Sequence, residues 1–441
     1  MFVKYFPQKN DYIIYRTFYK GGNVMKKICF ILISFLLLCA ILLHTSGCSA
    51  NIHAADLMDG VAPRRVETSL DFSERNACVT DFAVRLFKAS NESGKNTLIS
   101  PLSALCALAM AANGASGETR AQMEAVLGMS AEALNSYLHA YVNALPQGKN
   151  YRMHMANSVW FTDADDFSVN GDFLQMNADY YDADLYQAPF HDRTLRDINR
   201  WVKKETNGMI PEILERIPAD AVMYLVNALA FEAEWMEIYE KKQVREGTFT
   251  GEDGNKQTVT MMYATDHVKY LEDEYATGFF KYYKEGKYAF VALLPNEGVS
   301  LSEYVSTLDG ASLHALLTES ETAPVNTAIP KFESEYSAEL SEILKSMGMP
   351  LAFDENNADF SALGTCTSGN IFMSSVLQKT FIQVGEKGTK AGAATVIEMS
   401  KNSAVGGGSK QVYLDRPFVY MLVDCENNIP FFIGTVTDVN A

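Results

Sequence analysis

The sequence predicts an α+β fold in one large domain. Three observations favour it. Hydrophobic residues make up 48% of the 441 residues, which is enough to bury a large core. Helical patterns come first and strand patterns later, without the regular alternation of a doubly wound sheet. No Gly-, Pro- or Ser-rich boundary divides residues 70–385. We therefore expect a single domain over residues 70–441.

Helices are expected mainly in the first part of this domain. Phe82, Leu86 and Phe87 mark one amphipathic face, and helices are predicted over 102–112, which is almost entirely apolar, and over 118–127, which has an acidic first turn. Strands are predicted next, with one more helix among them: strands over 157–162, 223–235, 288–295 and 326–332, a helix over 337–349, and strands over 370–384, 417–424 and 429–439.

Residues 1–24 are interpreted as a mis-assigned upstream extension. Lys20-Gly21-Gly22 stands four residues before Met25, and its codons can spell a ribosome-binding sequence. We therefore expect translation to begin at Met25.

Residues 25–47 are predicted to be a lipoprotein signal peptide. A basic start is followed by the apolar run 28–43, too short for a membrane span, and by small residues before Cys48. This resembles the lipobox of bacterial lipoproteins, which implies acylation of Cys48; a plain secretory signal or a short anchor is the alternative. Residues 48–69 are polar and small, and are predicted to be a tether. We expect an extracellular or cell-surface protein, lipid-anchored to a bacterial membrane.

The charge of the chain is strongly acidic. Removing residues 1–47 takes away six of the 37 basic and one of the 54 acidic residues, and changes the formal charge from −17 to −22. Nucleic acid is therefore not expected as a partner, because phosphate contacts need a basic footprint. A cationic protein would be attracted at long range, although solvated acidic faces also account for such a charge.

Motifs of catalysis and metal binding are absent from the sequence. There is no HExxH, GxSxG, GxxxxGK[ST] or EF-hand pattern, and the seven histidines never occur at metal-ligand spacing. Beyond Cys48, no two cysteines form a CxxC pair. No catalytic residue, metal or cofactor is predicted, and an enzyme with an unrecognised site is the weaker alternative.

The segment "VLQKTFIQVGEKGTKAGAAT" (376–395) resembles the hinge of the reactive-centre loop of serpins. Further segments are similar to serpin signatures in the correct order: "NTLISPLSALCALAMAANGASGETRAQMEAVLG" (96–128), "NSVWF" (157–161), "INRWVKKETNGMIPEIL" (198–214), "LVNALAFEAEW" (225–235), "FVALLPNE" (290–297), "IPKFESEYSAELSEILKSMGM" (329–349) and "RPFVYMLVDCENNIPFFIGTVTDV" (416–439). The resemblance implies a serpin fold with three β-sheets, about nine helices and an exposed reactive-centre loop over about 386–415.

The hinge sequence is compatible with strand insertion. In a strand over residues 389–398, side chains would alternate between the two faces, and both charged residues, Lys390 and Glu398, would point outward. The hinge implied by the resemblance comprises Glu386, Gly388, Thr389, Ala391, Gly392, Ala393, Ala394 and Thr395. A small-residue strand that does not move is the alternative.

Polar residues are implied at the gate of the central sheet. Ser100, Ser103 and Asn227 match the family positions, and Gln378 stands where many serpins have histidine. An amide can donate and accept hydrogen bonds, so we expect gating to survive this change.

The reactive bond is expected between Asn402 and Ser403. This follows from the usual family spacing of 16 residues after Glu386; counting back from Pro417 gives a site near Gly406 instead. Lys401, Met399 and Val405 are alternative residues at the cleavage site. The sequence assigns no function to the glycines at 406–408.

The resemblance implies suicide inhibition. A serine, or alternatively a cysteine, protease would cleave the loop, form an acyl-enzyme, and be trapped covalently when the loop inserts into the central sheet. The target is expected to be elastase-like or trypsin-like, and the inhibitor a monomer that touches the membrane only through its anchor. A non-inhibitory serpin acting as a carrier or chaperone is the alternative within the family.

Overall fold

The computed structural model describes residues 52–66, 68, 73–163, 167–218, 221–367, 369–389 and 409–440. The chain separates into two units, Met1–Ile52 and His53–Ala441. The helices and strands of the described residues belong to the second unit. The upstream extension, the predicted signal peptide and Cys48 lie outside the described residues.

Nine α-helices occur in the described ranges. They are α2 (Ser73–Ser90), α3 (Pro101–Ala112), α4 (Gly117–Leu127), α5 (Ala131–Ala144), α6 (Gly171–Tyr181), α7 (Asp192–Glu205), α8 (Leu301–Thr307), α9 (Gly310–Glu319) and α10 (Ser341–Met347). Three 3₁₀ turns accompany them, at η1 (Lys241–Gln243), η2 (Lys284–Gly286) and η3 (Pro350–Phe353).

The strands form three sheets in the part of the chain that is described. Their bounds are β1 (Ala55–Asp56), β2 (Thr97–Ile99), β3 (Tyr151–Phe161), β4 (Ser168–Val169), β5 (Asp184–Gln187), β6 (Met223–Glu234), β7 (Val244–Thr250), β8 (Lys256–Glu272), β9 (Ala276–Tyr282), β10 (Tyr288–Pro295), β11 (Thr322–Pro330), β12 (Phe332–Glu339), β13 (Gly364–Thr365), β14 (Ser375–Gly385), β15 (Gly388–Thr389), β16 (Lys410–Tyr413), β17 (Phe418–Asp424) and β18 (Ile429–Val436).

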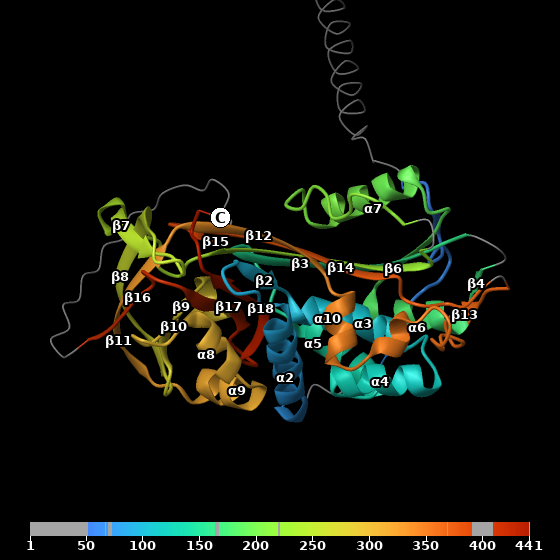
Figure 1. Cartoon of the computed structure of the whole chain (residues 1–441), viewed down its shortest axis with the longest axis horizontal. Helices are drawn as coiled ribbons and strands as arrows, with labels where there is room; N and C mark the ends of the chain where they lie inside the picture. The colour runs from blue at the N-terminus through green and yellow to red at the C-terminus, as the bar shows by residue number, and fades with distance from the viewer. Residues whose placement is uncertain are drawn as a thin grey trace, which may run out of the picture. The chain divides into compact units, whose positions relative to one another are not determined.

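The seven-stranded sheet has the order β1-β5-β3-β6-β15-β14-β12, and β6 also pairs directly with β14. The nine-stranded sheet runs β16-β11-β8-β9-β10-β17-β18-β2, with β7 on β8, and β4 pairs with β13 in a third sheet. Figure 1 shows α7 on one side of the seven-stranded sheet, with α3, α5 and α10 on the other. The α+β prediction is confirmed by this arrangement, with helices and strands around one core.

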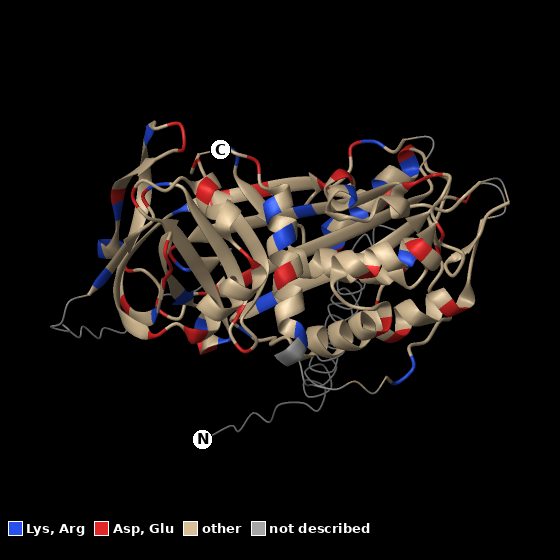
Figure 2. Ribbon diagram, turned by 60° about the horizontal axis from the view of Figure 1, so that its bottom comes forward, with Lys and Arg blue, Asp and Glu red and all other residues tan. Residues whose placement is uncertain are grey.

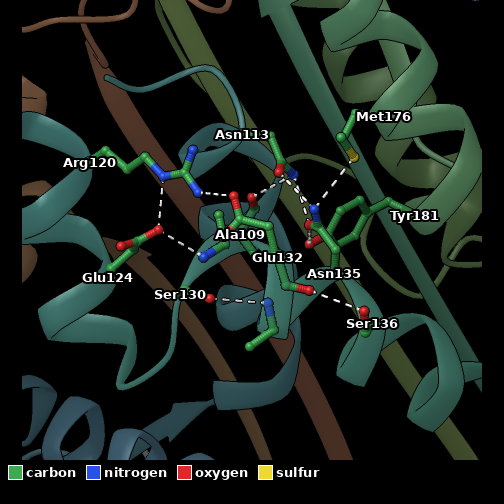
Figure 3. A network of polar contacts seen from close by, with 12 residues as sticks. Ala109, Asn113, Arg120, Glu124, Ser130, Glu132, Asn135, Ser136, Met176 and Tyr181 are labelled. Atoms are coloured by element: carbon green, nitrogen blue, oxygen red, sulfur yellow. Dashed lines mark hydrogen bonds and ion pairs between the residues drawn. The ribbon is translucent and has the colours of Figure 1, made fainter. Parts of the chain in front are cut away.

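Helix α3 lies at the centre of the core. Every residue from Pro101 to Ala112 is buried, as the apolar run predicts. The residue that follows α3 joins it to α5 through a reciprocal pair of amides (Figure 3): Asn113 donates to Asn135 at 2.9 Å and accepts from it at 2.8 Å. Tyr181 of α6 donates to the Asn135 oxygen at 2.5 Å. The helices below the sheet are thus fixed by buried polar contacts as well as by packing.

Arg120 of α4 is a second polar link in the same group of helices. It pairs with Glu124 one turn later at 2.8 Å and also contacts Glu132 of α5. Over the whole domain, acidic and basic residues are distributed on helices, strands and loops (Figure 2). Within the described residues, no helix is long and apolar enough to cross a membrane.

Candidate functional site

At one end of the seven-stranded sheet, the short strand β15 lies between β6 and β14 and separates them. Thr389 pairs with Val384 of β14 on one side and with Ala233 of β6 on the other, antiparallel to both. Over residues 375–380, β14 instead pairs directly with β6, in parallel. The beginning of the predicted reactive loop therefore already occupies a place between the two central strands.

Thr389 is fully enclosed in this position. Its exposed fraction is 0%, and its hydroxyl contacts the phenol hydroxyl of Tyr283. The Tyr283 ring stacks on Trp235 with centroids 4.5 Å apart. Burial raises the pKa of Tyr283 well above its ordinary value, so this phenol is neutral and can donate or accept.

Gly388 is required by the geometry of β15. Its φ is +150°, in a region that side chains rarely adopt. A Cβ atom at this position would lie 1.9 Å from the carbonyl oxygen of Ala233. Glycine therefore permits both the backbone angle and the close approach to β6.

The turn before β15 is held by backbone and side-chain contacts. The Trp235 amide donates to the carbonyl of Lys387 at 2.9 Å, and the Tyr239 amide donates to the carbonyl of Glu386 at 3.0 Å. The Glu386 carboxylate accepts a hydrogen bond from Lys331 at 2.9 Å. Three contacts from outside the loop thus position the turn that precedes the hinge.

The ion pair with Lys331 determines the protonation of Glu386. Burial disfavours the charged carboxylate, but the hydrogen bond from Lys331 and the local backbone outweigh this, and the pKa of Glu386 is lowered. Both side chains are 39% exposed, so solvent weakens the interaction.

Gln378 joins β14 to the entry of α3. Its side-chain oxygen accepts from the Ser100 amide at 2.9 Å, and its side-chain nitrogen donates to the Ser100 carbonyl at 2.9 Å. The Ser100 hydroxyl donates to the carbonyl of Phe431 at 2.9 Å. The amide side chain thus satisfies both backbone groups of the residue before the helix.

Asn227 forms the other half of the gate. It is the β6 partner of Gln378, and its side-chain nitrogen donates to the Ser103 carbonyl at 2.8 Å. Its side chain also contacts the Ser103 hydroxyl and Asn157 of β3. Four buried polar residues predicted from sequence are therefore brought together beneath the point where β6 and β14 meet.

The structure describes only part of the predicted site. It includes Glu386, Gly388 and Thr389 at the start of the loop and the four gate residues beneath β6 and β14. The remaining predicted residues lie outside the described residues: Ala391, Gly392, Ala393, Ala394, Thr395, Met399, Lys401, Asn402, Ser403, Val405 and Cys48.

Three residues of the site were not predicted from the sequence. Asn157 completes the gate, Tyr283 faces Thr389, and Lys331 pairs with Glu386. Asn157 carried no distinct signal, because β3 also contains the polar residues Arg152, His154 and Ser158. Tyr283 and Lys331 carried none, since their partners lie 106 and 55 residues away.

The distal end of the loop returns through β16, which pairs in parallel with β11. Asn326 donates to the Ser409 hydroxyl at 2.7 Å. Lys410 pairs with Glu272 at 3.2 Å and lies over the Tyr270 ring at 4.5 Å. Both ends of the loop are thus fixed, one in each large sheet.

The N-terminal segment lies against the far edge of the seven-stranded sheet. Residues 55–56 form β1 and pair antiparallel with β5. The His53 amide donates to Asp197 of α7 at 2.8 Å, and the His53 ring nitrogen lies 3.2 Å from the other oxygen of the same carboxylate. Part of the segment predicted as a tether is therefore joined to the body of the domain.

Arg64 makes the second attachment of this segment. Its guanidinium donates to one oxygen of Asp179 at 2.9 and 2.7 Å, and its amide donates to the other at 2.7 Å. Asp179 is 6% exposed. Burial opposes its charge, but the hydrogen bonds from Arg64 outweigh it, and the pKa of Asp179 is lowered.

The described residues contain no group of His, Cys, Asp or Glu side chains arranged to hold a metal ion. No disulfide bond joins any two of the cysteines at 78, 106, 366 and 425.

A model of the serpin family, described as serine protease inhibitors, matches residues 77–439. The chain belongs to the serpin family. This serpin is 32% identical to the leukocyte elastase inhibitor of Equus caballus over 362 residues, which cover 78% of this chain and 93% of the relative. The family thus includes members named as protease inhibitors.

Two solved structures of tengpin, a thermophilic serpin, are each 45% identical to this serpin. The native state superposes with a TM-score of 0.84 and covers 87% of this chain and 99% of tengpin. The latent state gives 0.73, with 85% and 99% covered. The serpin fold is confirmed, and the arrangement described here is more similar to the native than to the latent state.

Proposed function

We propose that the protein inhibits serine endopeptidases by offering residues 386–415 as a substrate and trapping the enzyme on the cleaved loop. The observation that carries this proposal is the position of Thr389, buried between β6 and β14. The residues that follow are small, with Ala391, Ala393 and Thr395 at alternate positions. A strand that has already started is thus followed by side chains suited to continuing it.

The register of β15 supports the same mechanism. If the pairing continues residue by residue, Thr395 reaches the level of both Asn227 and Gln378, which now pair with each other. The incoming strand would separate the two gate residues and place a hydroxyl between them. Lys390 would point outward opposite Glu232, a residue of opposite charge.

Strand insertion supplies the driving force. A strand from Gly388 to Asn402 has 14 residue steps and extends roughly 46 Å at ~3.3 Å each. Its new hydrogen bonds and buried side chains stabilise the inserted state, so the starting state is metastable and held by a kinetic barrier.

The chemistry is supplied by the protease. Its serine hydroxyl adds to the carbonyl carbon of Asn402, the bond to Ser403 breaks, and the amine of Ser403 leaves with a proton from the protease's own acid-base group. The product is an ester between Asn402 and the protease. Insertion before hydrolysis of this ester leaves the enzyme attached.

The target belongs to the elastase-like or trypsin-like proteases. The Ser-Ala-Val run at 403–405 suits an elastase-like pocket, while Lys401 suits a trypsin-like one. The charge of −22 that remains beyond residue 47 would attract a cationic enzyme at long range. The inhibitory relative is named for leukocyte elastase, which favours the first class.

The location proposed for the inhibitor is a bacterial cell surface, with Cys48 acylated after removal of residues 25–47. The apolar run before Cys48 and the small residues next to it support this. Cells producing Cys48→Ala should lose the surface-bound protein, and unchanged surface display would contradict the lipid anchor.

The experiment is incubation of the mature chain with trypsin-, chymotrypsin-, elastase- and subtilisin-like proteases. We expect at least one complex that survives boiling in detergent, and a released C-terminal peptide beginning at Ser403. Cleavage by every protease without a trapped complex would contradict the inhibitory mechanism and favour a non-inhibitory serpin.

A matched pair of variants tests insertion itself. Thr389→Arg places a charge in the buried site between β6 and β14, so the loop should be cleaved without trapping. Lys390→Arg keeps the charge of the next residue, which a continued strand would turn outward, and should leave the yield of trapped complex unchanged. Equal yields from the two variants would exclude insertion along β15.

A further inference from the structure

Helix α7 carries a row of basic residues on the side that faces away from the sheet. Arg193, Arg196, Arg200 and Lys203 follow one another at intervals of three and four residues, which places them on one face. The buried residues of the helix, among them Ile198 and Trp201, form the opposite face. Figure 1 shows α7 on the outer side of the seven-stranded sheet.

Most of this row is free to bind a partner. Arg193, Arg196 and Lys203 are exposed and make no ion pair among the described residues. Arg200 pairs with Asp197 at 2.5 Å. A concentration of unpaired cations is unexpected in a chain whose charge beyond residue 47 is −22. The row therefore differs from the solvated acidic surface that the composition predicts.

The N-terminal segment ends on this same helix. His53 donates from its backbone to Asp197, and the second oxygen of that carboxylate lies 3.2 Å from the His53 ring. Asp197 is 1% exposed, so this attachment is enclosed by the surrounding structure. Chain upstream of residue 53 therefore starts from the surface of α7.

The distance to the proposed lipid anchor is short. From Cys48 to His53 there are five residue steps, at most about 18 Å when fully extended. Because His53 contacts Asp197 of α7, an acylated Cys48 would keep this part of the helix within that length of chain from the membrane surface. Charges act over about 8 Å at physiological salt, so the basic residues attract the membrane when the chain upstream of His53 is not fully extended. This step rests on the acylation proposed above.

We propose that α7 is a membrane-facing surface, and that Arg193, Arg196 and Lys203 bind the anionic phospholipid headgroups of the membrane to which the protein is anchored. A basic patch beside the anchor adds electrostatic attraction to anionic headgroups and orients the domain on the membrane. Each basic residue near an anionic surface strengthens attachment about fivefold.

The test uses the mature chain, residues 48–441, with Cys48→Ala, so that binding does not depend on acylation. Its partitioning is measured on vesicles of phosphatidylcholine with about 30% phosphatidylglycerol, and on phosphatidylcholine alone. We expect binding to the anionic vesicles only, and its loss at high salt. The triple variant Arg193→Gln, Arg196→Gln, Lys203→Gln should bind on the order of 100-fold more weakly.

A control variant carries the same change of charge elsewhere. Lys149→Gln, Lys241→Gln, Lys256→Gln removes three exposed lysines that make no ion pair among the described residues. It should bind the anionic vesicles as the parent does. Glutamine keeps helix propensity close to that of arginine and lysine, and an unchanged unfolding midpoint checks that α7 is intact.

Three outcomes would overturn the proposal: equal binding of the two triple variants, equal binding to neutral and anionic vesicles, or selective binding of α7 to a sulfated polysaccharide with none to vesicles. Failure of Cys48 acylation in cells would remove the anchor but leave the vesicle result of the unlipidated chain unaffected. The two proposals are thus tested separately.

Discussion

The hydroxyl groups of Thr389 and Tyr283 meet inside the seven-stranded sheet, 106 residues apart in sequence. This contact makes the second residue of β15 part of the core of the uncleaved chain. Because both hydroxyls are buried, removal of either leaves the other without its partner. The hinge therefore has a defined bound position, and its release is a measurable event.

Gly388→Ala should expel β15 from the sheet. The added Cβ would lie 1.9 Å from the Ala233 carbonyl, and alanine also disfavours a φ of +150°. We expect faster amide hydrogen exchange at residues 387–389 and a loss of stability of about 1–3 kcal/mol. Gly298→Ala is the control, since Gly298 has a φ of +90° but nothing within 4 Å of its Cβ position. Equal losses of stability at both sites would show that the backbone angle φ causes the effect and that the contact with Ala233 does not.

The contribution of Glu386 to stability should disappear in acid. Its pKa is lower in the folded protein than the ordinary value of 4.5. The ion pair with Lys331 therefore stabilises the fold fully above about pH 4.5, and this is lost as the pH falls through the folded pKa. Because both groups are 39% exposed, we expect no more than about 1 kcal/mol.

The measurement is the difference in urea midpoint between the wild type and Glu386→Gln at pH 6.5 and at roughly pH 3.5. The difference should shrink in acid. Asp424→Asn serves as a contrast, because burial raises the pKa of Asp424. A carboxyl group with a raised pKa makes the folded protein more stable, relative to the unfolded chain, as the pH falls. A difference for Glu386→Gln that does not change with pH would contradict the assignment.

Arg64→Ala should detach the N-terminal segment. Asp179 would lose both guanidinium hydrogen bonds, so we expect a lower urea midpoint. The readouts are the urea midpoint and hydrogen exchange in α6. Arg65→Ala removes an exposed neighbour that makes no ion pair among the described residues and should have no effect. Equal values for both variants would show that the segment does not depend on Asp179.

Buried, continuous elements were predictable from the sequence. The strand predicted over 288–295 is β10, in which every residue is buried, and the apolar run 102–112 is α3 with one residue added. The helix predicted over 337–349 was wrong in its first part. Residues up to Glu339 belong to β12, where pairing with β14 overrides local helix propensity, and α10 begins at Ser341.

Long-range contacts of the site were not predictable. The four gate residues were found because they match serpin positions, but their joint hydrogen bonds depend on α3 lying beneath β6 and β14. The segment before residue 67 looked like a tether because it is polar. Its attachment depends on Asp179 and Asp197, which lie 115 and 144 residues away from Arg64 and His53. Local composition carries no information about such partners.

The direction of β15 determines which end of the seven-stranded sheet a protease attached to an inserted loop would reach. A strand that continued antiparallel to β6 from Thr389 would bring Asn402 just past Met223, at the opposite end of the sheet from the hinge. That is the end where β3 pairs with β5 and where β1 is added. Whatever is joined to Asn402 would thus be carried to the end of the domain where β1 lies, and so next to the N-terminal segment that His53 and Arg64 attach.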